Sequence, residues 1–418
     1  MANMIDYLVW RGELTLEASP WNEVDGLLLA TLSYLNFHGI QHPKGWTLEE
    51  LKRLDAVIPS TSSSYPLRKQ AFEGMADSIR FGKSRVHHFI AMTDETKTMQ
   101  FSAMCVDLPD GTMGVAFRGT DNTMIGWRED FNMAYQTRVP GQIAAEYYLT
   151  RAAQATDRPL RVTGHSKGGN LAVYAAASVA PEVQDRIVSL QVYDGPGMNR
   201  EISSGEGYER IRDKIRSYIP QTSIIGLLMD YYQPYTVVKS IAGGISQHDP
   251  MTWQVYGKHF EELPGIDRTA GLICETLHEW LQNSTPEQRG AFVDAMFQMA
   301  DGINATKMSD ITNEKLRSMW KMFGTRKEID PELRRVFSRL TAQAVTLGFG
   351  NVIDWVRGRR ESGAAGEWET MSPEKRREML EAAMNGKNTA EPEAAQDPGA
   401  AGSAETGTEE APEKGTES

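Results

Sequence analysis

Residues 161–170 read Arg-Val-Thr-Gly-His-Ser-Lys-Gly-Gly-Asn and contain the pattern Gly-x-Ser-x-Gly around Ser166. The apolar run 160–162 precedes the pattern, and the alanine-rich stretch 170–179 follows it. A serine on a tight turn from a strand into a helix has strained backbone angles, so glycine on either side lets the turn close. The start of the helix supplies amide donors and the positive end of the helix dipole. The pattern predicts a nucleophile elbow at Ser166, with a structural turn as the alternative.

A serine nucleophile needs a general base, and in a strand–turn–helix hydrolase the chain order is serine, acid, histidine. Three histidines follow Ser166, namely His248, His259 and His278. His248 lies in a loop just after the predicted last core strand, 235–240, where the base would return over the serine. We therefore predict His248 as the base, with a surface-loop histidine as the alternative. His165, beside Ser166, is expected to point away.

Two aspartates compete for the role of the acid that orients this base. Asp194, in Tyr193-Asp194-Gly195-Pro196, ends the strand that follows the predicted elbow helix, and Asp230 lies between the last two predicted strands. We favour Asp194 narrowly over Asp230. An aspartate in an Asp-Gly-Pro turn can also simply bond its own backbone.

An oxyanion hole would use the backbone amide of the residue after the nucleophile, Lys167, and a donor from an earlier loop. The segment Val115–Asp121 supplies such a loop directly after a predicted strand. Within it Thr120 can offer both an amide and a hydroxyl group. A strand end with a glycine turn is the alternative.

The elements that would position these residues alternate between strand and helix. Strands are predicted at 86–92, 101–108, 112–117, 187–193, 215–219 and 235–240, and helices near 142–155 and 170–180. Pro109-Asp110-Gly111 has the composition of a hairpin turn, and Asn22 is expected to cap an early helix. This order predicts an α/β fold, with a mostly parallel sheet covered by helices on both faces.

The chain is expected to contain an α/β domain at 1–268, a helical appendage at 269–388 and a disordered acidic tail at 389–418. Thr285-Pro286-Glu287-Gln288 predicts a capped helix start within the appendage. The tail contains eight acidic residues and one lysine but no aromatic residue, Leu, Ile, Val or Met. Such a segment cannot bury enough apolar surface to offset its ordering entropy.

The composition excludes several classes of protein. The 418 residues are 40% hydrophobic, and no uncharged apolar run is long enough to span a membrane. The net charge of −12 argues against a basic nucleic-acid-binding face. The N-terminal residues lack the basic, then apolar, then small-residue order of a signal peptide. Cys105 and Cys274 are predicted to be buried thiols in a reducing compartment, without zinc-ligand spacing. We therefore expect a cytoplasmic location and no metal site.

Several of these segments resemble a known family. The chain resembles the class 3 lipase branch of the α/β-hydrolases at Phe117-Arg118-Gly119-Thr120, at Trp127 and Asp130, and at Gly164-His165-Ser166-Lys167-Gly168-Gly169. It also resembles the Mbeg-type lipase-like bacterial proteins of unassigned function, at Asp6–Gly12, Asp194–Gly197 and Gln247–Pro250. The likeness covers about residues 5–260. It implies an α/β-hydrolase fold in which the Arg-Gly-Thr loop supplies an oxyanion donor.

Two positions depart from the pattern of the class 3 lipases. Lys167 stands where these lipases usually have leucine after the serine, and Ser223-Ile224-Ile225-Gly226 stands where their acid opens an Asp-x-Val-Pro stretch. The resemblance therefore supports Ser166, His248 and Thr120. The choice between the two candidate acids stays open.

Together these features predict a serine hydrolase that cleaves carboxylic esters through an acyl-enzyme on Ser166, without a metal or cofactor. The expected substrate is a small acyl ester or a lipid. Two alternatives remain. One is a non-catalytic hydrolase fold that binds a ligand or a partner, and the other is a thioesterase or peptidase with the same triad.

Overall fold

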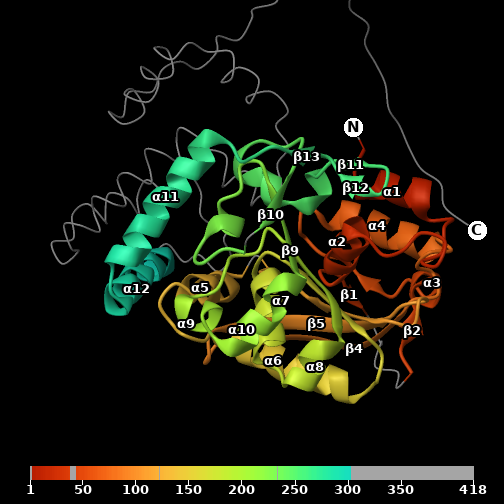
Figure 1. Ribbon diagram of the computed structural model, residues 1–418, viewed down its shortest axis with the longest axis horizontal. Helices are drawn as coiled ribbons and strands as arrows, with labels where there is room; N and C mark the ends of the chain where they lie inside the picture. The colour runs from red at the N-terminus through yellow and green to blue at the C-terminus, as the bar shows by residue number, and fades with distance from the viewer. Residues whose placement is uncertain (1, 38–43, 122, 233, 303–418) are drawn as a thin grey trace, which may run out of the picture. The chain divides into compact units, whose positions relative to one another are not determined.

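A mixed β-sheet forms the centre of the protein (Figure 1). The computed structural model describes residues 2–37, 44–121, 123–232 and 234–302. Within them the main sheet has nine strands in the order β13-β10-β9-β8-β7-β6-β5-β4-β2. Its strands are β2 (Trp46–Thr47), β4 (Arg85–Asp94), β5 (Met99–Asp107), β6 (Met113–Phe117), β7 (Leu160–His165), β8 (Ile187–Tyr193), β9 (Ile215–Pro220), β10 (Tyr235–Val238) and β13 (Glu262–Leu263).

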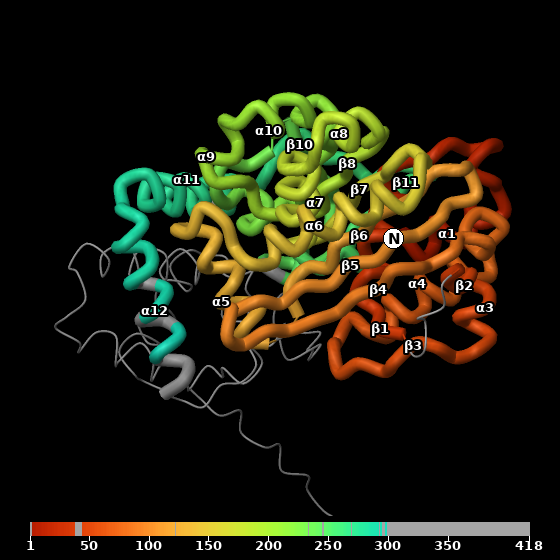
Figure 2. The backbone as a smooth tube through the Cα atoms, turned by 90° about the horizontal axis from the view of Figure 1, so that it is seen from below, coloured from red at the N-terminus to blue at the C-terminus, as the bar shows by residue number. Residues whose placement is uncertain are grey.

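The direction of the strands gathers several loops at one edge of the sheet. Strands β6, β7, β8, β9 and β10 run parallel to one another, and β13 pairs antiparallel with β10. Strands β2, β4 and β5 extend the sheet antiparallel on one side, and Figure 2 shows β4, β5 and β6 running next to one another. Because parallel strands end at the same edge, the segments that follow β6, β7 and β8 come together there. Two small sheets pair β1 (Asn36–Phe37) with β3 (Val57–Ile58) and β11 (Val255–Tyr256) with β12 (His259–Phe260).

Helices cover both faces of the sheet. One face packs against α1 (Met4–Arg11), α2 (Glu23–Leu32), α3 (Leu48–Arg53) and α4 (Tyr65–Asp77). The other packs against α6 (Pro140–Gln154), α7 (Lys167–Ser178), α8 (Pro181–Arg186) and α10 (Glu206–Ile211). The side chains of β5 alternate between the two faces of the sheet. Met104 and Val106 pack on the face of α1 to α4, while Ala103 and Cys105 pack on the face of α6 and α7. Shorter helices are α5 (Met124–Asn132), α9 (Arg200–Ser203), η1 (Arg212–Lys214), η2 (Ile225–Leu227), η3 (Gly244–His248) and η4 (Pro250–Thr252).

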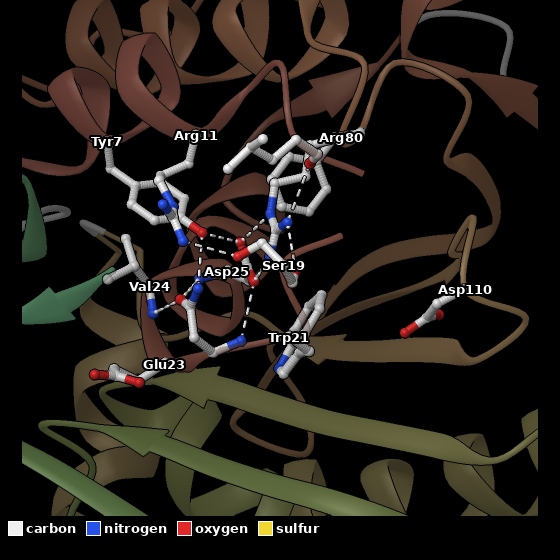
Figure 3. A network of polar contacts seen from close by, with 12 residues as sticks. Tyr7, Arg11, Ser19, Trp21, Glu23, Val24, Asp25, Arg80 and Asp110 are labelled. Atoms are coloured by element: carbon white, nitrogen blue, oxygen red, sulfur yellow. Dashed lines mark hydrogen bonds and ion pairs between the residues drawn. The ribbon is translucent and has the colours of Figure 1, made fainter. Parts of the chain in front are cut away.

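A buried ion pair joins α2 to the turn that follows α4 (Figure 3). Arg80 and Asp25 have fully buried side chains, and Arg80 Nε donates to Asp25 Oδ1 at 2.8 Å. The Tyr7 hydroxyl donates to the same oxygen at 2.6 Å, and the backbone N–H of Asn22 donates to Asp25 Oδ2 at 3.0 Å. Removing one member of such a pair costs about 3–5 kcal/mol, because the other charge stays buried. The pair therefore holds α2, which packs on β7, in one position.

The structure confirms the α/β fold class and the elements predicted for the core. The sheet is mixed rather than mostly parallel, because β2, β4, β5 and β13 pair antiparallel. The hairpin forms with Gly111 at a φ of +83°, a left-handed conformation that favours glycine. The Asn22 side chain caps α2 by accepting from the backbone N–H groups of Val24 and Asp25. Helices α6 and α7 occupy the two predicted helical segments.

Two helices follow the last strand, α11 (Arg268–Asn283) and α12 (Pro286–Gly302). The predicted helix start is confirmed, because the Thr285 hydroxyl accepts from the Gln288 N–H at 3.3 Å and Gln288 Oε1 accepts from the Thr285 N–H at 2.8 Å. These helices lie in the region predicted to be a helical appendage. The rest of that region and the acidic tail lie outside the described residues. In the described ranges, no helix is both long and apolar enough to cross a membrane.

Candidate active site

Ser166 lies between β7 and α7 in a strained backbone conformation, with φ 58° and ψ −133°. A Cβ atom at position 164 would come within 2.1 Å of the Gly168 carbonyl oxygen. At position 168 it would come within 2.1 Å of the Phe117 carbonyl oxygen. The two glycines of the motif are therefore required by close backbone approach, as expected for a nucleophile elbow. Strain in a non-glycine residue, about 1–3 kcal/mol, is typical of functional sites.

His248 and Asp194 meet at the same edge of the sheet as this turn. His248 Nδ1 lies 2.6 Å from Asp194 Oδ2; the Asp194 side chain is buried and that of His248 is 12% exposed. Asp194 follows β8 directly and has a φ of +47°, while its backbone N–H donates to the Tyr218 carbonyl oxygen at 2.8 Å. The next residue, Gly195, approaches the elbow so closely that a Cβ there would lie 2.9 Å from the Ser166 carbonyl oxygen. The Asp194–His248 pair therefore lies next to the turn that carries Ser166.

Asp230, the other candidate acid, is not brought to His248. Its side chain is exposed and accepts a hydrogen bond from the Ser203 hydroxyl at 2.8 Å. Its backbone pairs with Met198 in an isolated bridge.

The other two histidines after Ser166 are occupied elsewhere. His259 contacts Glu23 at 2.7 Å, and His278 Nε2 is bonded to the Met229 carbonyl oxygen.

The second carboxylate oxygen of Asp194 is held by residues that the sequence did not identify. Both the Ser223 hydroxyl and the backbone N–H of Gly226 donate to Asp194 Oδ1, the latter at 3.1 Å. These two residues belong to the segment aligned with the acid of the class 3 lipases. That segment therefore supplies hydrogen-bond donors to an aspartate from the preceding strand, which fixes the direction of its carboxylate.

His165 was expected to point away, but its side chain contacts His248. The His165 ring lies 4.6 Å from the His248 ring, and its Nε2 donates to the His248 carbonyl oxygen at 2.7 Å. A carbonyl only accepts, so His165 carries its proton on Nε2, and Nδ1 accepts from the Tyr34 hydroxyl at 2.7 Å. Burial, followed by the charge of His248, lowers the pKa of His165 well below its usual value. A neutral His165 thus anchors the backbone of His248.

The loop after β6 lies directly over the serine. A Cβ at Gly119 would lie 3.0 Å from Ser166 Cβ and 2.6 Å from the His165 carbonyl oxygen. The hydroxyl of the next residue, Thr120, donates to Asp130 Oδ2 in α5. With Asp130 ionised, this contact engages the single hydroxyl proton of Thr120.

The side chain of Lys167 is fully buried next to the elbow, although its sequence position suggested only an amide donor. Its Nζ donates to the Gln100 carbonyl oxygen at 2.8 Å, to Gln100 Oε1 at 2.9 Å and to Glu129 Oε2 at 3.0 Å. Glu129 is also fully buried and accepts from the backbone N–H groups of Gln100 and Gly141. Lys167 Nζ lies 3.8 Å from Asp130 Oδ1. These contacts connect the elbow to β5 and to α5.

Asp130 titrates above the usual range of aspartate, since burial raises its pKa to about 6 against the lowering effects of Lys167 and Thr120. A carboxyl whose folded pKa exceeds its unfolded value makes the free energy of unfolding fall as the pH rises from about 4 to about 6. Asp130→Asn removes this dependence. We expect the stability of the variant relative to wild type to rise by about 2 kcal/mol between about pH 4.5 and about pH 7.5.

Urea unfolding at both pH values measures this difference. Asp213→Asn is the control, because the side chain of Asp213 is 97% exposed. A relative stability of Asp130→Asn that stays constant with pH would contradict the assignment.

No group of three or more His, Cys, Asp or Glu side chains in metal-binding proximity surrounds Ser166 among the described residues, and the one such group there lies on β4 and β5.

The chain is similar to one protein family and, distantly, to solved lipase structures. A family model described as Mbeg1-like matches residues 75–298, just over half of the chain. The M37 lipase structure is 15% identical, with 50% of this chain and 70% of that chain covered and a TM-score of 0.33. Lipase II from Rhizopus niveus is 17% identical, with 46% and 75% covered and a TM-score of 0.30. No curated protein matches the chain. These structures are distant, so the details of the site rest on this chain's own geometry. By its match to this family model, the chain belongs to the Mbeg1-like family.

Proposed function

We propose that the protein is a serine hydrolase that cleaves carboxylic esters through an acyl-enzyme on Ser166. The observation that carries the proposal is the Asp194–His248 pair, 2.6 Å apart, at the sheet edge where Ser166 occupies a strained elbow. A carboxylate on Nδ1 keeps the proton of the neutral imidazole on that nitrogen, so the lone pair is on Nε2. His248 can then act as a general base toward a serine hydroxyl.

The proposed reaction proceeds in two halves. His248 Nε2 takes the proton of Ser166 Oγ as this oxygen bonds to the acyl carbon, and the carbonyl oxygen becomes an oxyanion. The backbone N–H groups of Lys167 and Thr120 donate to the oxyanion, and each such donor is worth roughly 3–4 kcal/mol in comparable sites. His248 then gives its proton to the leaving alcohol. Water repeats the sequence on the acyl-enzyme and releases the acid.

Hydrolysis of a series of p-nitrophenyl esters by the purified full chain tests the proposal. We expect turnover by the wild type and a loss of roughly 10⁴-fold or more in Ser166→Ala. Asp230→Asn is a matched control, because this exposed aspartate bonds Ser203 rather than the histidine. Equal turnover by Ser166→Ala and the wild type would rule out an acyl-enzyme on this serine. The same series, with p-nitrophenyl acetate at one end and long-chain esters at the other, would distinguish a small acyl ester from a lipid as substrate.

A further inference from the structure

A second cluster of reactive side chains lies on β4 and β5. It consists of His87, His88 and Cys105, whose ligand atoms all lie within 4.8 Å of one another. We propose that this cluster binds one divalent transition-metal ion of the zinc type. The proposal is independent of ester hydrolysis, because none of the three residues belongs to the candidate active site.

A β-bulge builds the cluster. The pairing of β4 with β5 shifts between His87↔Cys105 and Ile90↔Ala103, so β4 has one residue more than its partner in this interval. Neighbouring side chains on a regular strand point to opposite faces. Here His88 has a φ of +50°, and both imidazoles lie together with their Nδ1 atoms 2.7 Å apart. Cys105 stands directly opposite His87 in the register and is fully buried.

The distances suit a metal after small side-chain movements. With zinc–nitrogen bonds near 2.0–2.1 Å and zinc–sulfur bonds near 2.3 Å, tetrahedral ligand atoms lie roughly 3.3–3.6 Å apart. The Nδ1 atoms of His87 and His88 must therefore move apart slightly. The two ligand atoms that lie farthest apart must move slightly closer together. His88 is exposed, so its ring has room to turn. Water can fill the remaining coordination position from that side.

Surrounding groups orient the proposed ligands. His87 Nε2 lies 3.2 Å from Asp107 Oδ1, although the two atoms are not aligned for a hydrogen bond. A carboxylate beside the second nitrogen of a ligating histidine favours metal binding through the first. The Tyr148 hydroxyl, from α6, donates to the His88 carbonyl oxygen at 2.7 Å and lies 3.4 Å from Cys105 Sγ. One tyrosine thus contacts both the bulge and the thiol.

The donor set selects a class of ion. Two imidazoles and a thiolate favour zinc and related transition metals over magnesium or calcium. Cys105 binds a metal ion as its thiolate. Binding forms a metal–sulfur bond and breaks the S–H bond, and the proton is released to water.

Cobalt(II) titration of the full chain without a histidine tag tests the proposal, because a cobalt–thiolate bond gives a charge-transfer absorption band. We expect one cobalt per chain with this band, displacement by zinc, and a rise in Tm when zinc is added. His88→Ala should weaken binding at least tenfold, and Cys105→Ser should abolish the band. His259→Ala and Cys274→Ser are the matched controls, since His259 is also exposed and Cys274 is also a buried free cysteine. Both controls should bind like the wild type.

His88→Ala decides the outcome even if Cys105→Ser fails to fold, because it changes an exposed side chain. Wild-type protein that shows no thiolate band would overturn the proposal. Binding that is equally strong in His88→Ala would also overturn it.

Discussion

Replacing Asp194 with asparagine is expected to lower kcat for ester hydrolysis roughly 10⁴-fold while the protein stays folded. Asparagine adopts the left-handed φ of +47° at this position readily. Its amide oxygen can still accept from Ser223 and from the Gly226 N–H, as Oδ1 of Asp194 does. Its NH₂ group then faces His248 Nδ1 and forces the proton of the imidazole onto Nε2. His248 then has no lone pair on Nε2 and cannot act as the base toward Ser166.

Steady-state kinetics on a p-nitrophenyl ester measure this effect, and Asp230→Asn serves as the control. The two substitutions are chemically identical, and both aspartates are at loops near the same sheet edge. Of the two aspartates, Asp194 bonds His248 and Asp230 bonds Ser203. A larger loss of activity in Asp230→Asn than in Asp194→Asn would show that the acid has been assigned to the wrong residue.

Replacing Lys167 with leucine, the residue usual at this position in class 3 lipases, should reduce the free energy of unfolding by about 3–5 kcal/mol. The substitution leaves the Glu129 carboxylate fully buried without its cation, and it removes both donors to Gln100. Adding Glu129→Gln should recover part of the loss, because the double variant no longer buries an unpaired charge.

Urea unfolding of the two single variants and the double variant measures this coupling. Lys83→Leu is the matched control, since Lys83 pairs with Glu49 at 2.6 Å but is 73% exposed, and such surface pairs contribute about 0–1 kcal/mol. If Lys167→Leu costs no more than Lys83→Leu, the buried pair does not stabilise the elbow as described.

Local patterns explain why much of the fold and part of the site could be predicted from the sequence. The elbow depends on glycines within four residues of one another, and the hairpin depends on the turn Pro109-Asp110-Gly111. His248 followed from the order of the strands, because the loop after β10 ends at the same sheet edge as β7.

Long-range geometry explains what could not be predicted. Asp194 and Asp230 both lie at this edge. Only the conformation of the loop 221–230 turns Ser223 and Gly226 toward Asp194, and the same conformation turns Asp230 toward Ser203. The burial of Lys167 depends on Glu129, 38 positions away in the sequence. The cluster of His87, His88 and Cys105 depends on a bulge that no residue spacing indicates.

Covalent labelling with a fluorophosphonate, followed by peptide mass spectrometry, tests the central claim most directly. The reagent reacts with a serine whose hydroxyl is activated by a base, whatever the physiological ester is. We expect a single adduct on Ser166 of the wild type, none on Ser166→Ala, and labelling of His248→Ala slowed by roughly 10³-fold or more. Folded wild-type protein that remains unlabelled, or that is labelled equally fast in His248→Ala, would contradict the assignment of an activated serine at this site.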